Sequence, residues 1–263
     1  MVEIVVLGAA GRMGRMVLEA CAGKAQSVKV AGAVESKGVP GIGGKLAVGD
    51  VEIVLQDSLE AVLKPGQVII DFTTPESSMA ALQIAERVGA GYVLCTTGFT
   101  AEQKTRIESA ARRIPILMSP NMSVGVNVLF KVAEQVARTL GFDFDVEIVE
   151  AHHNQKKDAP SGTALGFAEA VAKGLDVSLK DAAVYGRHGM TGARPKGEIG
   201  IHAVRGGDIA GDHTVLFAGD GERVEIRHVA HGRKIFAQGA VRAALFLKDK
   251  SPGFYTMSDV LGL

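Results

Sequence analysis

The first half of the chain alternates short apolar runs with longer segments of helical period. Apolar runs rich in β-branched residues predict strands over residues 4–7, 28–34, 68–72, 92–95 and 116–118. Continuous apolar runs of this length are typical of strands that are buried on both faces. The intervening segments carry apolar residues at helical spacing. This order of elements predicts an α/β fold with a doubly wound parallel sheet of the Rossmann type.

The pattern changes after Gly125. A helix is predicted over residues 126–140, and residues 143–148 then alternate strictly between polar and apolar. Strict alternation indicates a strand with one face in water. Further strands are predicted over residues 199–205, 213–218 and 223–229, the last two joined as a hairpin. We therefore expect a second, α+β domain with a mixed, largely antiparallel sheet.

The last helical pattern, over residues 235–247, is rich in small residues and is expected to pack back on the first domain. The predicted boundaries are therefore residues 1–123 plus 233–263 for the first domain and 124–232 for the second. Residues 186–197, rich in glycine and basic side chains, are expected to form a mobile loop in the second domain.

Composition narrows the class of protein. The 263 residues are 47% hydrophobic, and 29 basic side chains balance 29 acidic ones, which argues against a dedicated nucleic-acid partner. No apolar run approaches the roughly 20 residues of a membrane span, and no secretory signal precedes the first strand. The two cysteines are too few for a metal site and far apart in sequence. We expect no metal and no membrane association, and the cysteines favour a cytoplasmic location.

A glycine-rich turn follows the first predicted strand. The sequence Gly8-Ala9-Ala10-Gly11-Arg12-Met13-Gly14 leads into a helical segment, and the second strand ends at Glu35. Glycines at such a turn let backbone N–H groups approach a pyrophosphate at the helix start, and the acid accepts hydrogen bonds from the ribose. A merely tight structural turn is the alternative. Glu35 favours NADH, whereas the nearby Lys37 leaves binding of NADPH open.

Polar turns follow three other predicted strands, after Phe72, Cys95 and Met118. Ligands of doubly wound sheets bind beyond the carboxyl ends of the strands. We therefore expect Thr96, Thr97 and Asn121 to line a ligand site, with ordinary loop chemistry as the alternative.

The loop after the alternating strand concentrates chemically active groups. His152 and His153 are adjacent, and Lys156 follows within the same short segment. Histidine suits proton donation near neutral pH, and lysine is a flexible point charge for a carboxylate or a developing anion. A lone histidine is more often structural than catalytic, but here two histidines and a lysine occur together. The loop is therefore predicted to carry catalysis.

The same loop ends in a predicted helix start. Pro160 precedes Ser161, a favourable N-cap residue, and a helix is predicted from Gly162. The N–H groups of Gly162 and Thr163, with the hydroxyls of Ser161 and Thr163, are expected to bind a carboxylate. Arg233, near the junction of the two domains, is a candidate for a second carboxylate contact, with a surface role as the alternative.

The chain resembles the 4-hydroxy-tetrahydrodipicolinate reductase (dihydrodipicolinate reductase) family over essentially its whole length. The most specific match is the segment from Glu150 to Ala164, which reads Glu-Ala-His-His-x-x-Lys-x-Asp-Ala-Pro-Ser-Gly-Thr-Ala. Shorter matches lie at residues 8–14, 71–73, 96–99 and 121–127.

The resemblance implies an NADH- or NADPH-dependent reduction of 4-hydroxy-tetrahydrodipicolinate, a small cyclic dicarboxylate, to tetrahydrodipicolinate and water in lysine biosynthesis through diaminopimelate. It implies that His152 is the proton donor, that Lys156 is the second catalytic residue, and that the substrate domains assemble a homotetramer. It also implies substrate contacts from His153, Gly162 and Thr163. The residues implied to bind the cofactor are Gly8, Ala9, Ala10, Gly11, Arg12, Met13, Glu35, Cys95, Thr96, Thr97, Ser119, Pro120, Asn121 and Met122.

Three positions depart from the family pattern. Ser36 and Thr74 stand where members that use NADPH well often carry arginine, so the expected preference for NADPH is lower. Cys95 replaces a glycine that is common in that loop. Two alternatives stay open: a related two-domain amino-acid dehydrogenase, and a nucleotide-sensing protein without catalysis.

Overall fold

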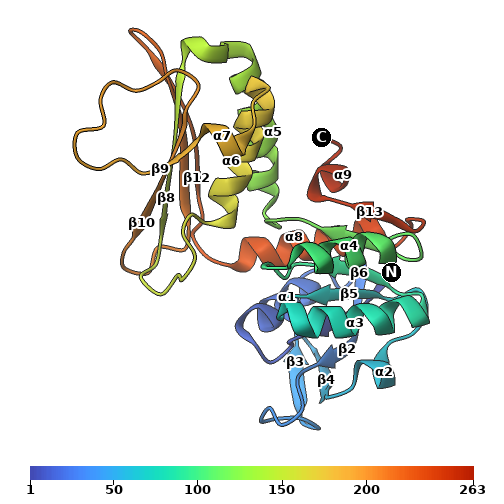
Figure 1. Ribbon diagram of the computed structural model, residues 1–263. Coiled ribbons are helices and arrows are strands. Elements are labelled where there is room, and N and C mark those ends of the chain that lie inside the picture. Colours follow the sequence, from blue (N-terminus) through green and yellow to red (C-terminus); the bar gives the residue numbers. More distant parts are fainter. The chain divides into compact units, whose positions relative to one another are not determined.

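The computed structural model describes the backbone of residues 1–263 and every side chain except that of Val51. The chain divides into two compact units. Unit 1 comprises Met1–Ser123 and Arg233–Gly262, and unit 2 comprises Val124–Gly232 together with Leu263. Figure 1 labels the helices and strands of both units.

Unit 1 is built on an eight-stranded sheet with the order β13-β7-β6-β5-β1-β2-β4-β3. All neighbouring strands are parallel except β3 and β4, which form an antiparallel pair at one edge. The strands are β1 (Val2–Leu7), β2 (Val28–Val34), β3 (Lys45–Val48), β4 (Val51–Gln56), β5 (Val68–Asp71), β6 (Gly91–Leu94), β7 (Pro115–Met118) and β13 (Gly253–Tyr255). The expected doubly wound sheet is therefore confirmed, with β1 and β5 adjacent at its centre.

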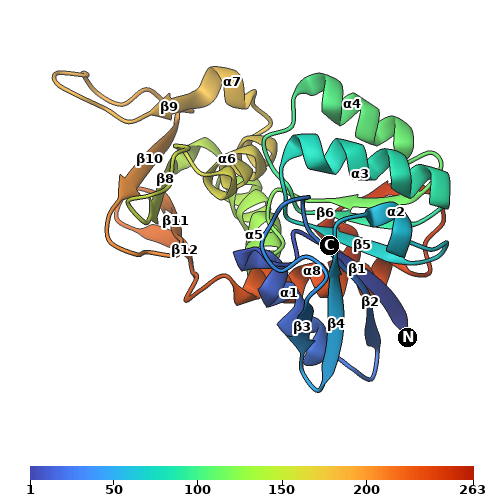
Figure 2. The same cartoon turned by 90° about the horizontal axis from the view of Figure 1, so that it is seen from below.

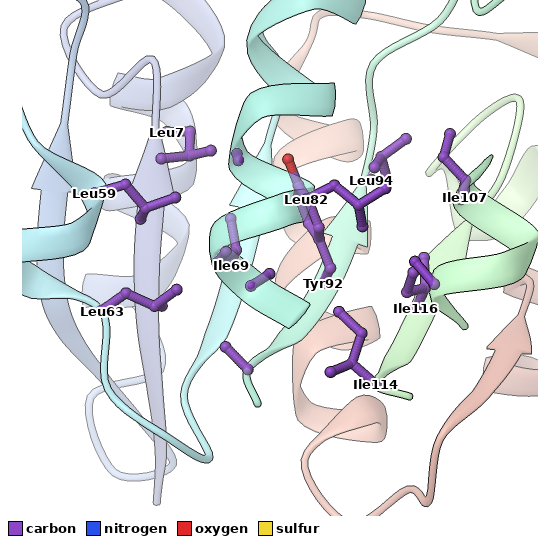
Figure 3. Close-up of a cluster of buried hydrophobic side chains, with 14 of the residues drawn as sticks. Leu7, Leu59, Leu63, Ile69, Leu82, Tyr92, Leu94, Ile107, Ile114 and Ile116 are labelled. Atoms are coloured by element: carbon purple, nitrogen blue, oxygen red, sulfur yellow. The ribbon is translucent and has the colours of Figure 1, made fainter. Parts of the chain in front are cut away.

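Helices cover both faces of this sheet (Figure 2). On one face lie α2 (Leu59–Val62), α3 (Pro75–Val88) and α4 (Ala101–Ala110); on the other lie α1 (Arg12–Ala22) and α8 (Lys234–Leu247), while α9 (Met257–Leu261) ends the unit. Leu82 of α3 and Ile107 of α4 pack with Ile69, Tyr92 and Ile116 of the strands, as Figure 3 shows. Both faces of the central strands are thus buried, which explains their uninterrupted apolar sequences.

Unit 2 contains a five-stranded sheet with the order β12-β11-β8-β10-β9. Its strands are β8 (Asp145–His152), β9 (Ala183–Tyr185), β10 (Ile199–Arg205), β11 (Asp212–Ala218) and β12 (Arg223–Val229). β8 pairs antiparallel with β11 and parallel with β10, so the sheet is mixed, as expected. The β9–β10 pair is parallel and the β11–β12 pair is antiparallel, so neither direction predominates.

The helices of unit 2 are α5 (Val124–Leu140), α6 (Gly162–Leu175) and α7 (Leu179–Ala182), with a short 3₁₀ helix at Gly141–Asp143. α5 and α6 cover one face of the sheet, where Phe167 of α6 packs with Ile148 of β8 and Val215 of β11. Because side chains alternate along a strand, every second residue of β8 points to this core, including Glu150 and His152. The strand thereby carries two polar groups into the buried layer.

Glycine often follows the end of a helix, but Gly174 lies inside α6, which continues to Leu175. A Cβ atom at Gly174 would lie 2.4 Å from the carbonyl oxygen of Glu134 in α5. This glycine therefore permits close packing of two helices and does not end one; Asp176, with φ of 57°, takes the C-cap position.

Candidate active site

The turn between β1 and α1 is closed around its glycines. Gly8 has φ of +67°, and the N–H of Gly11 donates to the Gly8 carbonyl at 3.0 Å. A Cβ atom at Gly14 would lie 2.1 Å from the Gly8 carbonyl oxygen, so only glycine fits there. The N-cap residue of α1 is Gly11, and because glycine has no side chain, no side-chain group of this residue caps the helix start. The turn is thus shaped for close approach of a ligand group to the backbone N–H groups at the start of α1.

Glu35 lies beside this turn at the end of β2. Its carboxylate accepts hydrogen bonds from the N–H of Ala10 at 3.2 Å and from the N–H of Ser36 at 3.0 Å. A hollow next to it is lined by Gly8, Glu35, Ser36 and, across the strand ends, Thr73. The glycine turn, the acid and the hollow fit the pyrophosphate and adenosine ribose of a nicotinamide cofactor.

A buried hydrogen-bonded cluster lies at the end of β5. Asp71 is fully buried and accepts from the Tyr92 hydroxyl at 2.6 Å and from the Ser78 hydroxyl at 2.6 Å. It also accepts from the backbone N–H of Thr73 at 2.7 Å. The Thr96 hydroxyl lies 2.9 Å from the Ser78 hydroxyl, so this predicted cofactor residue is part of the buried cluster. The cluster ties the turn after β5 to the turn after β6.

A second hollow in unit 1 lies beside the turns that follow β6 and β7. It is lined by Cys95, Ser119, Asn121 and Met122 together with Phe72 and Phe236. Burial, reinforced by the charge of Asp71, raises the pKa of the Cys95 thiol, which is therefore neutral. With Pro120, which also lines this hollow, five predicted cofactor residues share it, whereas Thr97 is exposed.

In unit 2 the end of β8 presents a buried acid and histidine. Nδ1 of His152 lies 2.6 Å from Oε2 of Glu150, and Glu150 is fully buried. Arg205 of β10 donates to both carboxylate oxygens, at 2.8 Å each, and the N–H of Ser161 donates to Oε1 at 2.9 Å. Burial alone raises the pKa of Glu150, but these hydrogen bonds outweigh burial and leave the pKa below its ordinary value.

Helix α6 begins next to this group. Ser161 is the N-cap, and its hydroxyl accepts from the N–H of Ala164 at 3.1 Å, as expected for a serine there. The same oxygen lies 3.0 Å from Nε2 of His213 in β11. Gly162 is exposed, and a Cβ atom there would meet nothing within 4 Å, so the helix start is open to a ligand.

Lys156 lies on the loop between β8 and α6. Its ammonium is 3.0 Å from a carboxylate oxygen of Asp158, and 20% of its side chain is exposed. His153 is half-buried and anchors the loop through its backbone N–H, which donates to the Ile209 carbonyl at 2.8 Å. The structure therefore gathers His152, Lys156 and the start of α6 in unit 2, whereas Arg233 belongs to unit 1, at the N-cap of α8.

Two members of the unit 2 group were not predicted. His213 is buried, and its ring centroid lies 5.1 Å from that of His152; Arg205 holds Glu150. A signal for both is present in the sequence. In the predicted strands, alternation places Arg205 on the face of Ile199 and Ile201, and His213 on the face of Val215 and Phe217. A polar residue on a core face indicates a specific role.

Within the described side chains, no group of three or more histidine, cysteine, aspartate or glutamate residues could hold a metal ion. None of the helices in the described part of the chain has the length and apolar character needed to cross a bilayer.

A dinucleotide turn in one unit and a histidine–lysine loop beside an open helix start in the other define a two-domain, nicotinamide-dependent oxidoreductase. Family comparisons then specify which one. Residues 2–122 match the family model described as "Dihydrodipicolinate reductase, N-terminus" and residues 125–261 match "Dihydrodipicolinate reductase, C-terminus". The chain belongs to the dihydrodipicolinate reductase family, whose members use NADH or NADPH.

Relatives and solved structures agree with this assignment. The 4-hydroxy-tetrahydrodipicolinate reductase of Burkholderia cenocepacia is 51% identical over 264 residues, which cover 99% of each chain. The protein of the same name from Anaeromyxobacter dehalogenans is 48% identical over 267 residues, covering 100% of this chain and 98% of the relative. A dipicolinate-bound dihydrodipicolinate reductase from Paenisporosarcina sp. TG-14 has the same fold, with a TM-score of 0.75, 24% identity and 97% of each chain covered.

Proposed function

We propose that the chain reduces 4-hydroxy-tetrahydrodipicolinate to tetrahydrodipicolinate in lysine biosynthesis, with His152 as the proton donor and Lys156 as the second catalytic residue. Full-length relatives at about half identity carry the name of this activity. The observation that supports the site is the loop after β8, where His152, Lys156 and the open start of α6 lie together.

The overall reaction requires one proton donor. It consumes a hydride and a proton and releases water, and the bound reduced nicotinamide supplies the hydride. We infer that His152 gives the proton, because its Nδ1 faces Glu150 and Nε2 is the ring nitrogen left for the reacting group. A histidine held in this way is the usual form of a general acid.

We assign binding of a substrate carboxylate to Lys156 and the first turn of α6. Ser161 has its own hydroxyl engaged with Ala164, so the N–H groups of Gly162 and Thr163 are the natural donors to an anion. Lys156 is now paired with the exposed Asp158, and a carboxylate would replace that partner. The Paenisporosarcina protein was solved with dipicolinate, a ring bearing two carboxylates. We assign further substrate contacts to His153 and Arg233.

We assign the cofactor to unit 1, which we propose as the dinucleotide-binding domain, with unit 2 as the substrate domain. Gly8 to Met13 would hold the pyrophosphate, and Glu35 the adenosine ribose. The turns at Cys95–Thr97 and Ser119–Met122 would bind the nicotinamide end, because they border the second hollow of this unit.

A coupled assay tests this proposal. The substrate is generated enzymatically, and loss of the absorbance of NADH or NADPH is followed with and without it. We expect oxidation of the cofactor only when 4-hydroxy-tetrahydrodipicolinate is present. Oxidation of amino acids with NAD⁺ instead would indicate an amino-acid dehydrogenase, and cofactor binding without any turnover would indicate a sensor.

We propose further that the protein is a cytoplasmic homotetramer. The face of the unit 2 sheet opposite α5 and α6 carries the exposed side chains of Val149, Val204 and Val229. Apolar residues gathered on one open sheet face indicate contact with another chain. Light scattering coupled to gel filtration tests this assembly: a tetramer is expected, and a Val149→Lys variant is expected to dissociate.

A further inference from the structure

Glu150 is an unusual residue for the core layer of unit 2. Its neighbours on the same face of β8 are Val146 and Ile148, both buried and apolar. A buried carboxylate is costly unless donors satisfy it, and well-packed apolar residues are often at least as stabilising as a buried ion pair. Glu150 has four donors, from Arg205 (two), Ser161 and His152. Its presence therefore calls for a reason beyond stability.

The contact with Glu150 fixes the state of the His152 ring. A carboxylate only accepts hydrogen bonds, so Nδ1 at 2.6 Å must carry the hydrogen. The ring then has its remaining nitrogen, Nε2, available for the reacting group. Oε2 of Glu150 also accepts from Arg205, so His152 and Arg205 share one oxygen of the carboxylate.

We propose that Glu150 and Arg205 are positioning residues for His152: Glu150 fixes the tautomer and orientation of the ring, and Arg205 holds the carboxylate and partly neutralises it. The pair would thereby set the pH range in which His152 carries the proton that it delivers. This inference rests on the proposed role of His152 as proton donor.

The charges around His152 predict opposite effects for the two residues. Burial is the largest influence and lowers the pKa of His152; the hydrogen bond and charge of Glu150 raise it, and the charges of Lys156 and Arg205 lower it. His213, from β11, faces the same ring, but burial lowers its own pKa to about 3, so it is uncharged near neutral pH. Glu150 is therefore the one group among these that favours the protonated ring.

Two substitutions separate this role from a general structural one. Glu150→Gln removes the negative charge at nearly constant shape, so His152 should lose its proton at lower pH. Arg205→Met removes the cation and leaves Glu150 in place, so His152 should keep its proton to higher pH. A general loosening of the site would instead shift the pKa of His152 in the same direction in both variants.

The test is titration of His152 by NMR in the full-length protein with isotopically labelled histidine, together with the pH dependence of kcat/KM. The His152 signal is identified by its absence in His152→Gln. We expect the midpoint, and the alkaline limb of kcat/KM, to shift by at least about half a pH unit, downward in Glu150→Gln and upward in Arg205→Met. Such a shift changes the ratio of protonated to unprotonated His152 roughly threefold at a given pH. In the unmodified protein, the nitrogen chemical shifts of the His152 ring should show that Nδ1 carries the hydrogen.

The matched control is Glu147→Gln, which makes the same change three residues away, on the opposite face of β8. Glu147 is likewise held by arginines and lies 2.7 Å from Nε2 of His202. This variant should leave the titration of His152 unchanged. Should Glu150→Gln fail to fold, Arg205→Met and Glu150→Asp still decide. The aspartate keeps the charge but shortens the reach, so kcat should fall while the alkaline limb shifts by less than about half a pH unit.

Shifts of the same sign in Glu150→Gln and Arg205→Met, or no shift in either, overturn the inference. Failure of the proposed function looks different. If His152→Gln retains its kcat, His152 is not the proton donor. The NMR titration of His152 in the unmodified chain and in the Glu150 and Arg205 variants still reports whether these two residues control the ring.

Discussion

Replacing Gly14 with alanine tests whether the glycine turn is built for close backbone contact. The added Cβ would lie 2.1 Å from the Gly8 carbonyl oxygen, 2.6 Å from Ala9 Cα and 2.8 Å from the Gly8 carbonyl carbon. Ordinary carbon contacts begin near ~3.5 Å, so α1 would have to retreat from the turn by about 1 Å. Overpacking of this kind costs about 3 kcal/mol at the upper end of its usual range, and the gain in helix propensity returns about 1 kcal/mol.

The remaining loss of about 2 kcal/mol should appear mainly where the turn meets its ligand. It corresponds to a roughly thirtyfold weaker affinity for NADH, measured by fluorescence titration of the purified protein. A thermal melt should show whether part of the loss appears as a lower Tm.

Gly23→Ala is the matched control at the other end of the same helix. The nearest atoms to its Cβ are 3.7 and 3.8 Å away, and Gly23 has φ of −66°, which alanine adopts freely. This change should stabilise the fold by about 0.4–1 kcal/mol and leave NADH affinity unchanged. If Gly14→Ala bound NADH within a factor of two of the unmodified chain and melted at the same temperature, the turn would accommodate a Cβ atom at this position, and close backbone contact would not be needed there.

Glu35→Gln should raise the NADPH-to-NADH ratio of kcat/KM by about three- to tenfold, because a like-charge contact of the order of 1 kcal/mol disappears; an unchanged ratio would contradict a ribose-binding role. Tyr92→Phe removes the 2.6 Å hydrogen bond to the buried Asp71 and should cost about 1.5–3 kcal/mol, seen as a lower midpoint in urea; no change in the midpoint would mean that the hydroxyl does not stabilise the fold. Burial alone raises the pKa of Glu147, but hydrogen bonds from Arg187, His202 and Arg194 outweigh it and lower the pKa from 4.5 to about 2. The stability that the ionised Glu147 contributes is complete above pH 4.5 and is lost as the pH falls toward 2. In Glu147→Gln, the free energy of unfolding should therefore fall less steeply with decreasing pH. An equally steep fall in the variant would contradict this role of Glu147.

The strands that could be predicted are those in which the pattern of apolar residues itself indicates which side chains are buried. β2, β10 and β12 begin and end at the predicted residues, because apolar runs or strict alternation span them completely. The antiparallel pair β3–β4 and the three-residue strand β13 were not predicted. β13 exists because it extends the sheet beside β7, and that pairing partner lies more than a hundred residues away in the chain.

In the candidate site, too, some residues could be predicted from one short segment of sequence, whereas others depend on the pairing of distant strands. His152, Lys156 and Ser161 lie within one short segment, so their grouping could be predicted from spacing and from the N-cap preference of serine. Arg205 and His213 come from β10 and β11, and their place beside Glu150 depends on the register of three strands. One residue of slip would turn each to the other face, and a single sequence does not fix that register.

In the function that we propose, His152 delivers the proton in the reduction of 4-hydroxy-tetrahydrodipicolinate. The most direct test is the steady-state kinetics of His152→Gln with enzymatically generated substrate and NADH, at a pH where the unmodified protein is fully active. Loss of a general acid typically lowers the rate by about 10²–10⁴-fold, so kcat should fall by that amount while KM changes only a few-fold. A variant with near-normal kcat would contradict the account.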